Sequence, residues 1–245
     1  MEKFLADFQQ SFVEANRWKA LLSGLGVTLK ITFLALVLGV VLGVLVAVVR
    51  SSHDQLEIQH KKNGVLNVLN AICQVYLTVI RGTPVMVQLL IMYFVILAST
   101  TNTTLVAMLT FGINSGAYVA EIIRSGIMAV DKGQTEAGRS LGLSYVQTMS
   151  NIVIPQAIKN ILPALGNEFI ALLKETSIVN IIGMKDITKW AMNVQGRTYQ
   201  AFMPFLGIAA IYLILVLGLS RLVSIMERRL NPDVTADKQR NRDKH

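Results

Sequence analysis

The sequence predicts an all-α integral membrane protein with five transmembrane helices, its N-terminus outside and its C-terminus in the cytoplasm. Hydrophobic residues make up 53% of the 245 residues and charged residues only 16%, with a mean hydropathy of +0.51. So little charge does not cover a water-soluble fold of this size. The apolar residues also gather in long uncharged runs, and a helix needs ~20 apolar residues to cross the hydrocarbon core.

Each expected span corresponds to one apolar run. The run at Ile31–Val49 is longer than the apolar core of a secretory signal peptide and follows a mixed-charge segment, so we expect an uncleaved span. Residues 82–120 carry no charge and hold two spans around the polar turn ASTTNTT, whereas the half-polar stretch 63–80 predicts a lead-in helix. The expected spans are residues 23–49, 82–98, 104–120, 161–184 and 200–222, within a transmembrane domain over 23–226.

The N-terminal segment 1–22 predicts an amphipathic helix on the outer membrane surface. Phe4, Phe8 and Phe12 are four residues apart and share one helix face, and Trp18 suits the depth of the lipid headgroups.

Small residues recur at every fourth position of the first span, at Gly39, Gly43 and Ala47. This spacing favours close helix packing, either within the chain or across a dimer. At the other end of the following loop, Arg81 of the RGTP sequence is expected to anchor the second span at the cytoplasmic interface.

The distribution of basic residues predicts the orientation. With five spans, 15 Lys and Arg residues fall on the side that holds residues 50–81, 121–159 and 221–245, whereas six fall on the other side. The positive-inside rule places the richer side in the cytoplasm. The basic tail 227–245 is therefore interpreted as a topological anchor near anionic lipid. The net charge of +8 does not indicate a nucleic-acid partner.

The stretch GQTEAGRS at 133–140 differs from the phosphate-binding P-loop pattern by one residue, because Arg139 stands in the place of the lysine. A P-loop also needs a preceding buried strand, and the residues before this stretch have helical spacing. We therefore expect an exposed cytoplasmic helix capped by Thr135. Its expected face consists of Ala137, Leu141 and Tyr145, with Gly138 and Gly142 on an adjacent stripe that lets a partner surface approach.

Glu136-Ala137-Gly138, Gly142 and Ile152-Val153-Ile154-Pro155 resemble, in identity and spacing, the EAA loop of membrane subunits of ABC importers. The chain departs from the family pattern E-A-A, three residues, G, nine residues, I-x-L-P at Gly138 and Ile154. The stretches YLTVIRGTPVMVQLL, INSGAYVAEIIRSGI and VIPQAIKNILPALGNEF are similar to the polar amino-acid branch of these permeases, and the resemblance covers nearly the whole chain.

The resemblance implies a multi-pass permease subunit in a bacterial cytoplasmic (inner) membrane that translocates a polar amino acid. The loop 133–156, between spans three and four, would be the coupling helix. The implied partners are ABC ATPase subunits, a second permease subunit (a homodimer or a close paralogue) and an extracellular amino-acid-binding protein. ATP and Mg would be bound by the ATPase, with no cofactor on this chain. The implied coupling residues are Glu136, Ala137, Gly138, Gly142, Ile152 and Pro155.

Polar residues within the spans are the candidates for substrate contact, because ionisable groups are costly there. Glu168 meets either a substrate ammonium or guanidinium group, or a structural partner such as Lys174. Asn167 lies beside it, and Asn114 and Gln88 occupy neighbouring spans, where interhelical hydrogen bonds are the alternative.

A self-contained ion-coupled amino-acid transporter, with Glu168 or Glu175 carrying a proton, is the alternative function, although the sequence shows no internal repeat. An enzyme is not expected, because no catalytic arrangement is present. His53 and His60 lie in an expected polar loop without carboxylate partners, so we predict no metal site. A lone Cys73 excludes an internal disulfide.

Overall fold

The computed structural model describes residues 2–58, 60 and 63–230, and these residues are helical apart from short connections. The helices are α1 (Glu2–Phe8), α2 (Arg17–Ile58), α3 (Gly64–Gly82), α4 (Val85–Ile91), α5 (Thr103–Met128), α6 (Lys132–Ser140), α7 (Tyr145–Thr148), α8 (Ile154–Glu175), α9 (Ile187–Thr198) and α10 (Phe202–Leu230). Turns of π-helix at Gln9–Val13, Met92–Ile96 and Met149–Val153, and of 3-10 helix at Glu14–Asn16 and Thr176–Ile182, extend or join them.

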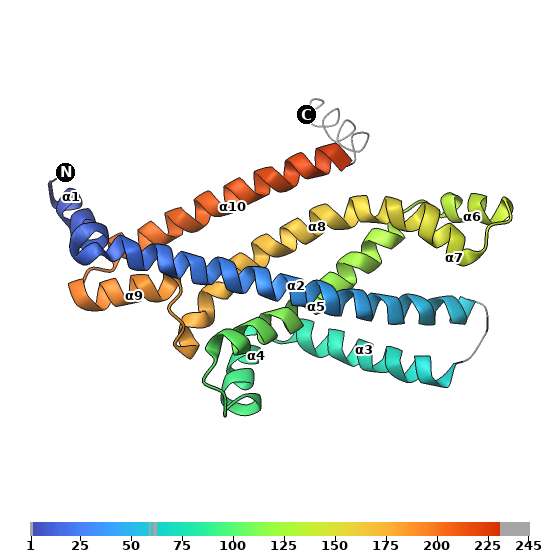
Figure 1. Cartoon of the computed structure of the whole chain (residues 1–245), viewed down its shortest axis with the longest axis horizontal. Helices are drawn as coiled ribbons and strands as arrows, with labels where there is room; N and C mark the ends of the chain where they lie inside the picture. The colour runs from blue at the N-terminus through green and yellow to red at the C-terminus, as the bar shows by residue number, and fades with distance from the viewer. Residues whose placement is uncertain (1, 59, 61–62, 231–245) are drawn as a thin grey trace.

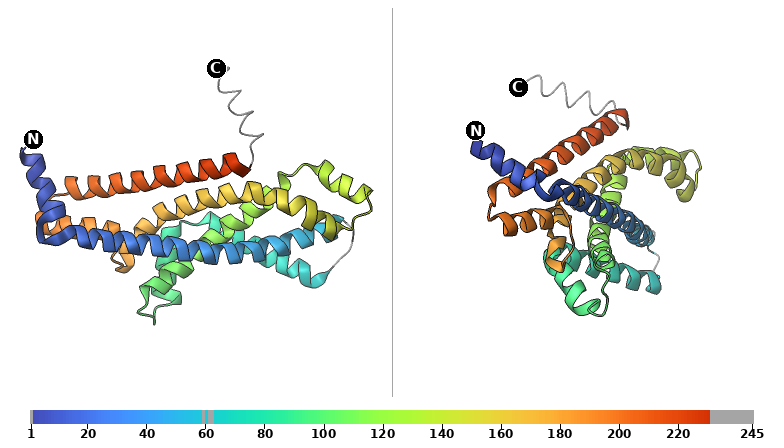
Figure 2. Two further views of the ribbon diagram at one scale, coloured as in Figure 1. Left: turned by 45° about the horizontal axis from the view of Figure 1, so that its top comes forward. Right: turned by 60° about the vertical axis from the view of Figure 1, so that its left-hand side comes forward.

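The long helices lie side by side in an elongated bundle (Figure 1). Helix α2 runs along the bundle, α3 folds back beside it, and α5 and α8 pack across it, with α10 along α8. Helices α1 and α9 lie at one end of the bundle and α6 and α7 at the other, as both views of Figure 2 show. The two ends are therefore built from different short helices.

Four helices among the described residues are long and apolar enough to cross a membrane: the segment Phe4–Glu57, Gly64–Gly82, Thr103–Met128 and Phe202–Leu230. This confirms an all-helical membrane protein.

The second expected span differs from the structure. Gly64–Gly82 is itself a helix of spanning length rather than a lead-in, and the expected span 82–98 holds only the shorter helix Val85–Ile96. The helix breaks at Thr83 because Pro84 has no N–H to donate and forces the preceding residue into an extended conformation, with φ −122° and ψ 146°.

Two other elements have bounds that the sequence did not indicate. The fourth segment begins at Ile154, ahead of the expected 161, and its helix ends at Glu175, where 3-10 turns take over. The N-terminal helical segment ends at Val13. Ala15 and Asn16 then adopt positive φ and turn the chain, and residues 17–22 already belong to α2.

Some N-terminal aromatic side chains are exposed, and one packs against the protein. Phe4, Phe8 and Trp18 are exposed, as a surface segment requires. Phe12 instead packs inward, with its ring centroid 5.2 Å from that of Trp190. At the other terminus, residues 231–245 of the expected basic tail lie outside the described residues.

Small residues allow α2 and α5 to approach closely. A Cβ atom added to Gly39 would lie 2.9 Å from the Cβ of Ser115, and one added to Gly43 would lie 2.9 Å from the backbone nitrogen of Ala120. Gly112 and Gly116 of α5 receive the Leu38 and Leu42 side chains in the same way. The small-residue stripe of the first span therefore acts within the chain.

We predict that Gly43→Ala destabilises the protein by about 1–3 kcal/mol, because the new methyl group overpacks the contact between α2 and α5. Gly26→Ala, in the same helix, is the matched control, since nothing lies within 4 Å of its added Cβ. That control should be neutral or stabilising by up to ~1 kcal/mol. Reversible unfolding in mixed detergent, followed by circular dichroism, measures both. Equal stability of the two variants would contradict the packing argument.

Candidate functional site

The GQTEAGRS stretch forms most of α6, at the end of the bundle opposite the N-terminus (Figure 1). The helix is capped by Asp131, whose Oδ1 accepts a hydrogen bond from the Gly133 N–H at 2.6 Å. The prediction that Thr135 is the cap was wrong, because Thr135 lies inside the helix. The helical backbone through these glycines is also incompatible with a phosphate-binding loop.

Gly138 and Gly142 lie in different surroundings. Gly138 is buried against the chain itself, since an added Cβ would lie 2.8 Å from Thr148 Cγ2 and 3.0 Å from Ile152 Cδ1. The expectation that it makes room for a partner is therefore not supported. Gly142 is exposed and has φ +83°, which ends α6 and favours glycine. Leu143 N–H accordingly donates to Gly138 O at 3.2 Å.

Because α6 ends at Ser140, the expected face through Ala137, Leu141 and Tyr145 does not exist as one helix face. Leu141 instead lies in the turn and is 82% exposed, and Val146 in α7 is 73% exposed. These two exposed aliphatic side chains in a polar segment are candidates for contact with a partner. The prediction omitted Val146, although the capping box of Ser144 and Gln147 around it is visible in the sequence.

The other predicted coupling residues flank this turn. Glu136 and Ala137 are exposed on α6, and Pro155 is exposed in the first turn of α8. Ile152 lies on the inner side, against Gly138. The loop is thus a short helical hairpin whose tip holds Leu141 and Val146, and we call this pair the apolar tip.

Gln88 stabilises the break between α3 and α4. Its Nε2 donates to Ile80 O at 2.8 Å and to Thr83 O at 3.1 Å, and it lies 2.8 Å from Thr83 Oγ1. Its Oε1 accepts from Asn114 Nδ2 at 3.0 Å. These carbonyl groups lose their helical partners at Pro84, so the amide of Gln88 satisfies acceptors that lipid cannot.

Glu168 of α8 contacts α5 at the residue next to Asn114. Ser115 Oγ donates to Glu168 Oε1 at 2.7 Å, and Ser115 is the neighbour of Asn114. Three of the four predicted substrate residues therefore converge on one turn of α5, while Asn167 is exposed on α8. Lys174 is exposed as well, and among the described residues no ion pair joins it to Glu168. The partner of this carboxylate is thus a hydroxyl group.

Arg81, which was expected to anchor the span at the membrane interface, contacts two side chains of α5. Its Nη1 lies 3.6 Å from Glu121 Oε2, and its guanidinium lies over the Tyr118 ring. Glu121 also pairs with Arg124 at 3.6 Å. Arg81, Arg50 and Tyr118 line a cavity of about 550 Å³ that opens between α2, α3 and α5.

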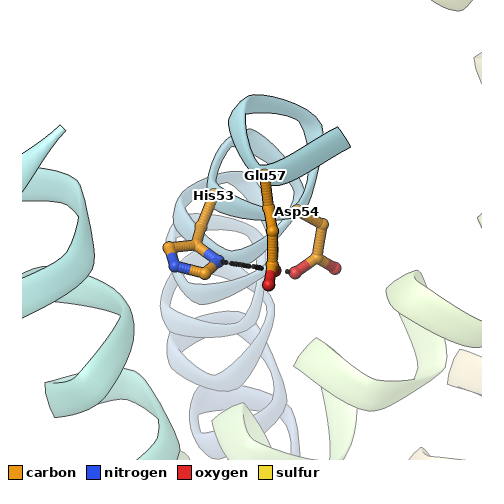
Figure 3. A group of neighbouring side chains, drawn as sticks. All are labelled: His53, Asp54 and Glu57. Carbon is orange, nitrogen blue, oxygen red and sulfur yellow. Dashed lines mark ion pairs between the residues drawn. The ribbon is translucent and has the colours of Figure 1, made fainter. Parts of the chain in front are cut away.

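His53 does have carboxylate neighbours, contrary to the sequence prediction, because α2 continues as a helix to Ile58. Figure 3 shows both carboxylates on the same side of its ring, with Asp54 Oδ1 at 3.7 Å and Glu57 Oε2 at 4.0 Å from Nδ1. The carboxylates are 51% and 77% exposed and both distances are longer than a hydrogen bond, so these pairs contribute little to stability.

Comparison with known proteins identifies relatives of this chain. The family described as "Binding-protein-dependent transport system inner membrane component" matches residues 63–234. The chain is 38% identical to the arginine transport system permease protein ArtQ of Bacillus subtilis, covering 86% of this chain and 92% of ArtQ. It is 35% identical to the glutamine transport system permease protein GlnP of Escherichia coli over 66% of this chain and 76% of that protein. A crystal structure titled as an amino acid ABC transporter with histidines is similar with a TM-score of 0.78 and 45% identity, covering 86% of this chain and 94% of the other.

We predict that Gln88→Leu destabilises the fold by about 1–3 kcal/mol, because the carbonyl groups at the helix break lose their donor. Gln74→Leu is the control, since Gln74 is exposed on α3. Detergent unfolding followed by circular dichroism should separate the two variants. If Gln88→Leu is as stable as the wild-type chain, the helix break does not depend on this amide.

Proposed function

Because this chain belongs to the family of inner membrane components of binding-protein-dependent transport systems, we propose that it forms the path of an ABC importer for a polar amino acid. The chain is a multi-pass permease component of the inner membrane, and the ATPase is a separate subunit. Membership of this family argues against the alternative function, a self-contained ion-coupled transporter.

We propose five crossings with the N-terminus outside. Helix α2 makes the first, α3 and α4 together make a second and broken one, and α5, α8 and α10 make the others. This order puts α1 and α9 on the outer side and α6 and α7 in the cytoplasm, in agreement with their positions at opposite ends of the bundle (Figure 2). It also leaves the larger number of basic residues inside.

The observation that carries the proposal is the apolar tip, Leu141 and Val146, on the hairpin that bears the EAA spacing. A short helical hairpin with exposed apolar side chains at its tip would fit a groove in a partner protein. That partner is the ATPase, which would bind ATP and Mg. The hairpin continues directly into α8, so movement of the tip would be transmitted to Glu168 in that helix. The loop 133–156 is accordingly the coupling segment of the transmembrane domain over 23–226.

The substrate proposed is a polar amino acid, because relatives are named for arginine and glutamine transport. Glu168 is the group proposed to meet its ammonium or guanidinium group, since the hydroxyl of Ser115 leaves the carboxylate without a neutralising cation. Gln88 and Asn114, occupied with each other and the helix break, are proposed as supports. An extracellular binding protein would deliver the substrate, and a second permease subunit, identical or paralogous, would complete the path.

We predict that Leu141→Glu combined with Val146→Glu abolishes assembly with the ATPase, because a groove that accepts aliphatic side chains would have to desolvate two carboxylates. Co-purification on a tagged ATPase measures assembly. Val65→Glu is the control, since Val65 is 72% exposed but lies on α3. Normal assembly of the double variant would contradict the coupling role.

We predict that Glu168→Gln lowers arginine uptake by the assembled transporter at least about tenfold, because a hydrogen bond to an ionised group contributes ~1.5–3 kcal/mol. Glutamine retains an acceptor for Ser115, and Glu175→Gln is the control. ATP-driven uptake into proteoliposomes, with a panel of amino acids, measures the effect. Unchanged uptake of every amino acid would make Glu168 a structural residue. Uptake by the permease alone under a pH gradient would contradict the importer itself.

A further inference from the structure

A groove separates the cytoplasmic half of α2 from the segment that joins α5 to α8. Its inner part is a cavity of about 350 Å³ whose walls are mainly aliphatic. The walls include Val44 and Val48 of α2, Ile123 and Ile127 of α5, and Ile154 and Ile161 of α8. Val44 and Val48 are 43% and 59% exposed, so the protein alone leaves this apolar space unfilled.

The groove continues outward into a second cavity of about 300 Å³. The two cavities share Ser51, Gln55, Ile127, Tyr145 and Met149, so they form one continuous space. The outer part is charged, and its rim holds Arg124, Arg139 and Asp54. The groove is therefore apolar at one end and cationic at the other.

The position along α2 gives the depth of the groove in the membrane. The uncharged run Ile31–Val49 ends at Arg50, and the inner cavity lies against the last turns of that run. The outer cavity lies against the next turns, from Ser51 to Gln55. The groove thus crosses the boundary between hydrocarbon and headgroups, on the side of the bundle that holds α6 and α7.

The arginines at the rim are only partly neutralised. Arg124 shares the carboxylate of Glu121 with Arg81, each pair at 3.6 Å, so one negative charge serves two guanidinium groups. Arg139 donates to Leu143 O at 3.0 Å, and within the described part of the chain it forms no ion pair. Asp54 faces His53 at 3.7 Å. Arg81, Arg124 and Arg139 carry three positive charges, against two negative charges on Glu121 and Asp54, so the rim keeps a net positive charge for an anion.

We propose that the groove binds an anionic phospholipid of the cytoplasmic leaflet, with an acyl chain in the inner cavity and the phosphate at Arg124 and Arg139. Basic pockets between transmembrane helices on the cytoplasmic side favour such headgroups. An acyl chain matches the inner cavity because that cavity is apolar and lies at hydrocarbon depth. A soluble anion would leave the inner cavity unfilled, and a zwitterionic lipid would leave the arginines without net negative charge.

The bound lipid would have a structural consequence for the coupling segment. It would contact α2 through Ser51 and Gln55 and the coupling segment through Tyr145 and Met149. These two walls belong to parts of the chain that are far apart in sequence. The lipid would therefore hold the base of the coupling hairpin against the longest helix.

The test measures lipid retained by the full-length chain. The protein is placed in bilayers of equal parts phosphatidylglycerol and phosphatidylcholine, extracted in mild detergent, and its bound lipids are counted by native mass spectrometry. We expect preferential retention of phosphatidylglycerol. Arg124→Gln and Arg139→Gln should each weaken it about fivefold, and Arg124→Lys with Arg139→Lys should preserve it. Arg197→Gln removes one charge from α9, at the opposite end of the bundle, and should leave retention unchanged.

A second variant separates the groove from a general attraction to arginine. Ser51→Phe fills the shared part of the groove while both arginines remain, so retention should be lost. Gln55→Phe, on the same wall, replaces it if the first variant does not give a folded, monodisperse protein. Undiminished retention by the filled variant would overturn the assignment.

Two further results would also overturn it. Glycerol phosphate carries the anionic group without acyl chains and should not displace the lipid, so effective displacement would make the site one for soluble anions. Equal retention of phosphatidylcholine by the wild-type chain would show that the arginines do not select the headgroup.

Discussion

The close approach of α2 and α5 is the contact on which the rest of the structure depends. Hydrocarbon offers no hydrophobic force to join two helices, so close packing of small residues must supply the attraction. Gly39 and Gly43 provide it from α2, and Gly112 and Gly116 provide it from α5. The turn of α5 between those last two glycines carries the polar pair Asn114 and Ser115. The contact therefore also fixes the position of the polar groups that reach α4 and α8.

The lipid environment explains why these polar side chains bond to one another or to the backbone. A helix broken inside a bilayer must satisfy its freed carbonyl groups from within the protein. Gln88 does so at the break before Pro84, and Asn114 fixes the orientation of the Gln88 amide. The adjacent Ser115 then binds Glu168 of α8. The structural pair Gln88 and Asn114 and the candidate substrate group Glu168 are thus linked through adjacent residues of α5.

The sequence predicted what depends on composition and spacing, namely the membrane class and the close-packing stripe at Gly39 and Gly43. The coupling role of the EAA loop stays a prediction. It could not predict features in which tertiary packing decides between local options. The half-polar helix Gly64–Gly82 has almost the bounds expected of the lead-in helix but is of spanning length. Its Tyr76 hydroxyl donates to Ile113 O at 2.6 Å, and the sequence does not reveal such a tertiary partner for a polar group. Asp131 and Thr135 are both acceptable caps by type, and only the course of the backbone after α5 selects Asp131. Gly138 faces Thr148, which spacing along one helix does not reveal.

The same connectivity limits how ATP hydrolysis in a partner could act on the path. The coupling hairpin is packed on itself through Gly138 and Ile152, so it would move as one body and not by bending at its glycines. That body continues without a loop through the π-helical turn Met149–Val153 into α8. A displacement at the tip would therefore be passed to α8, where Glu168 accepts a hydrogen bond from Ser115 of α5. Two discrete positions of α8 against α5 are a simpler switch than a gradual deformation, and a partner that favours one of them would shift the equilibrium by its difference in binding free energy.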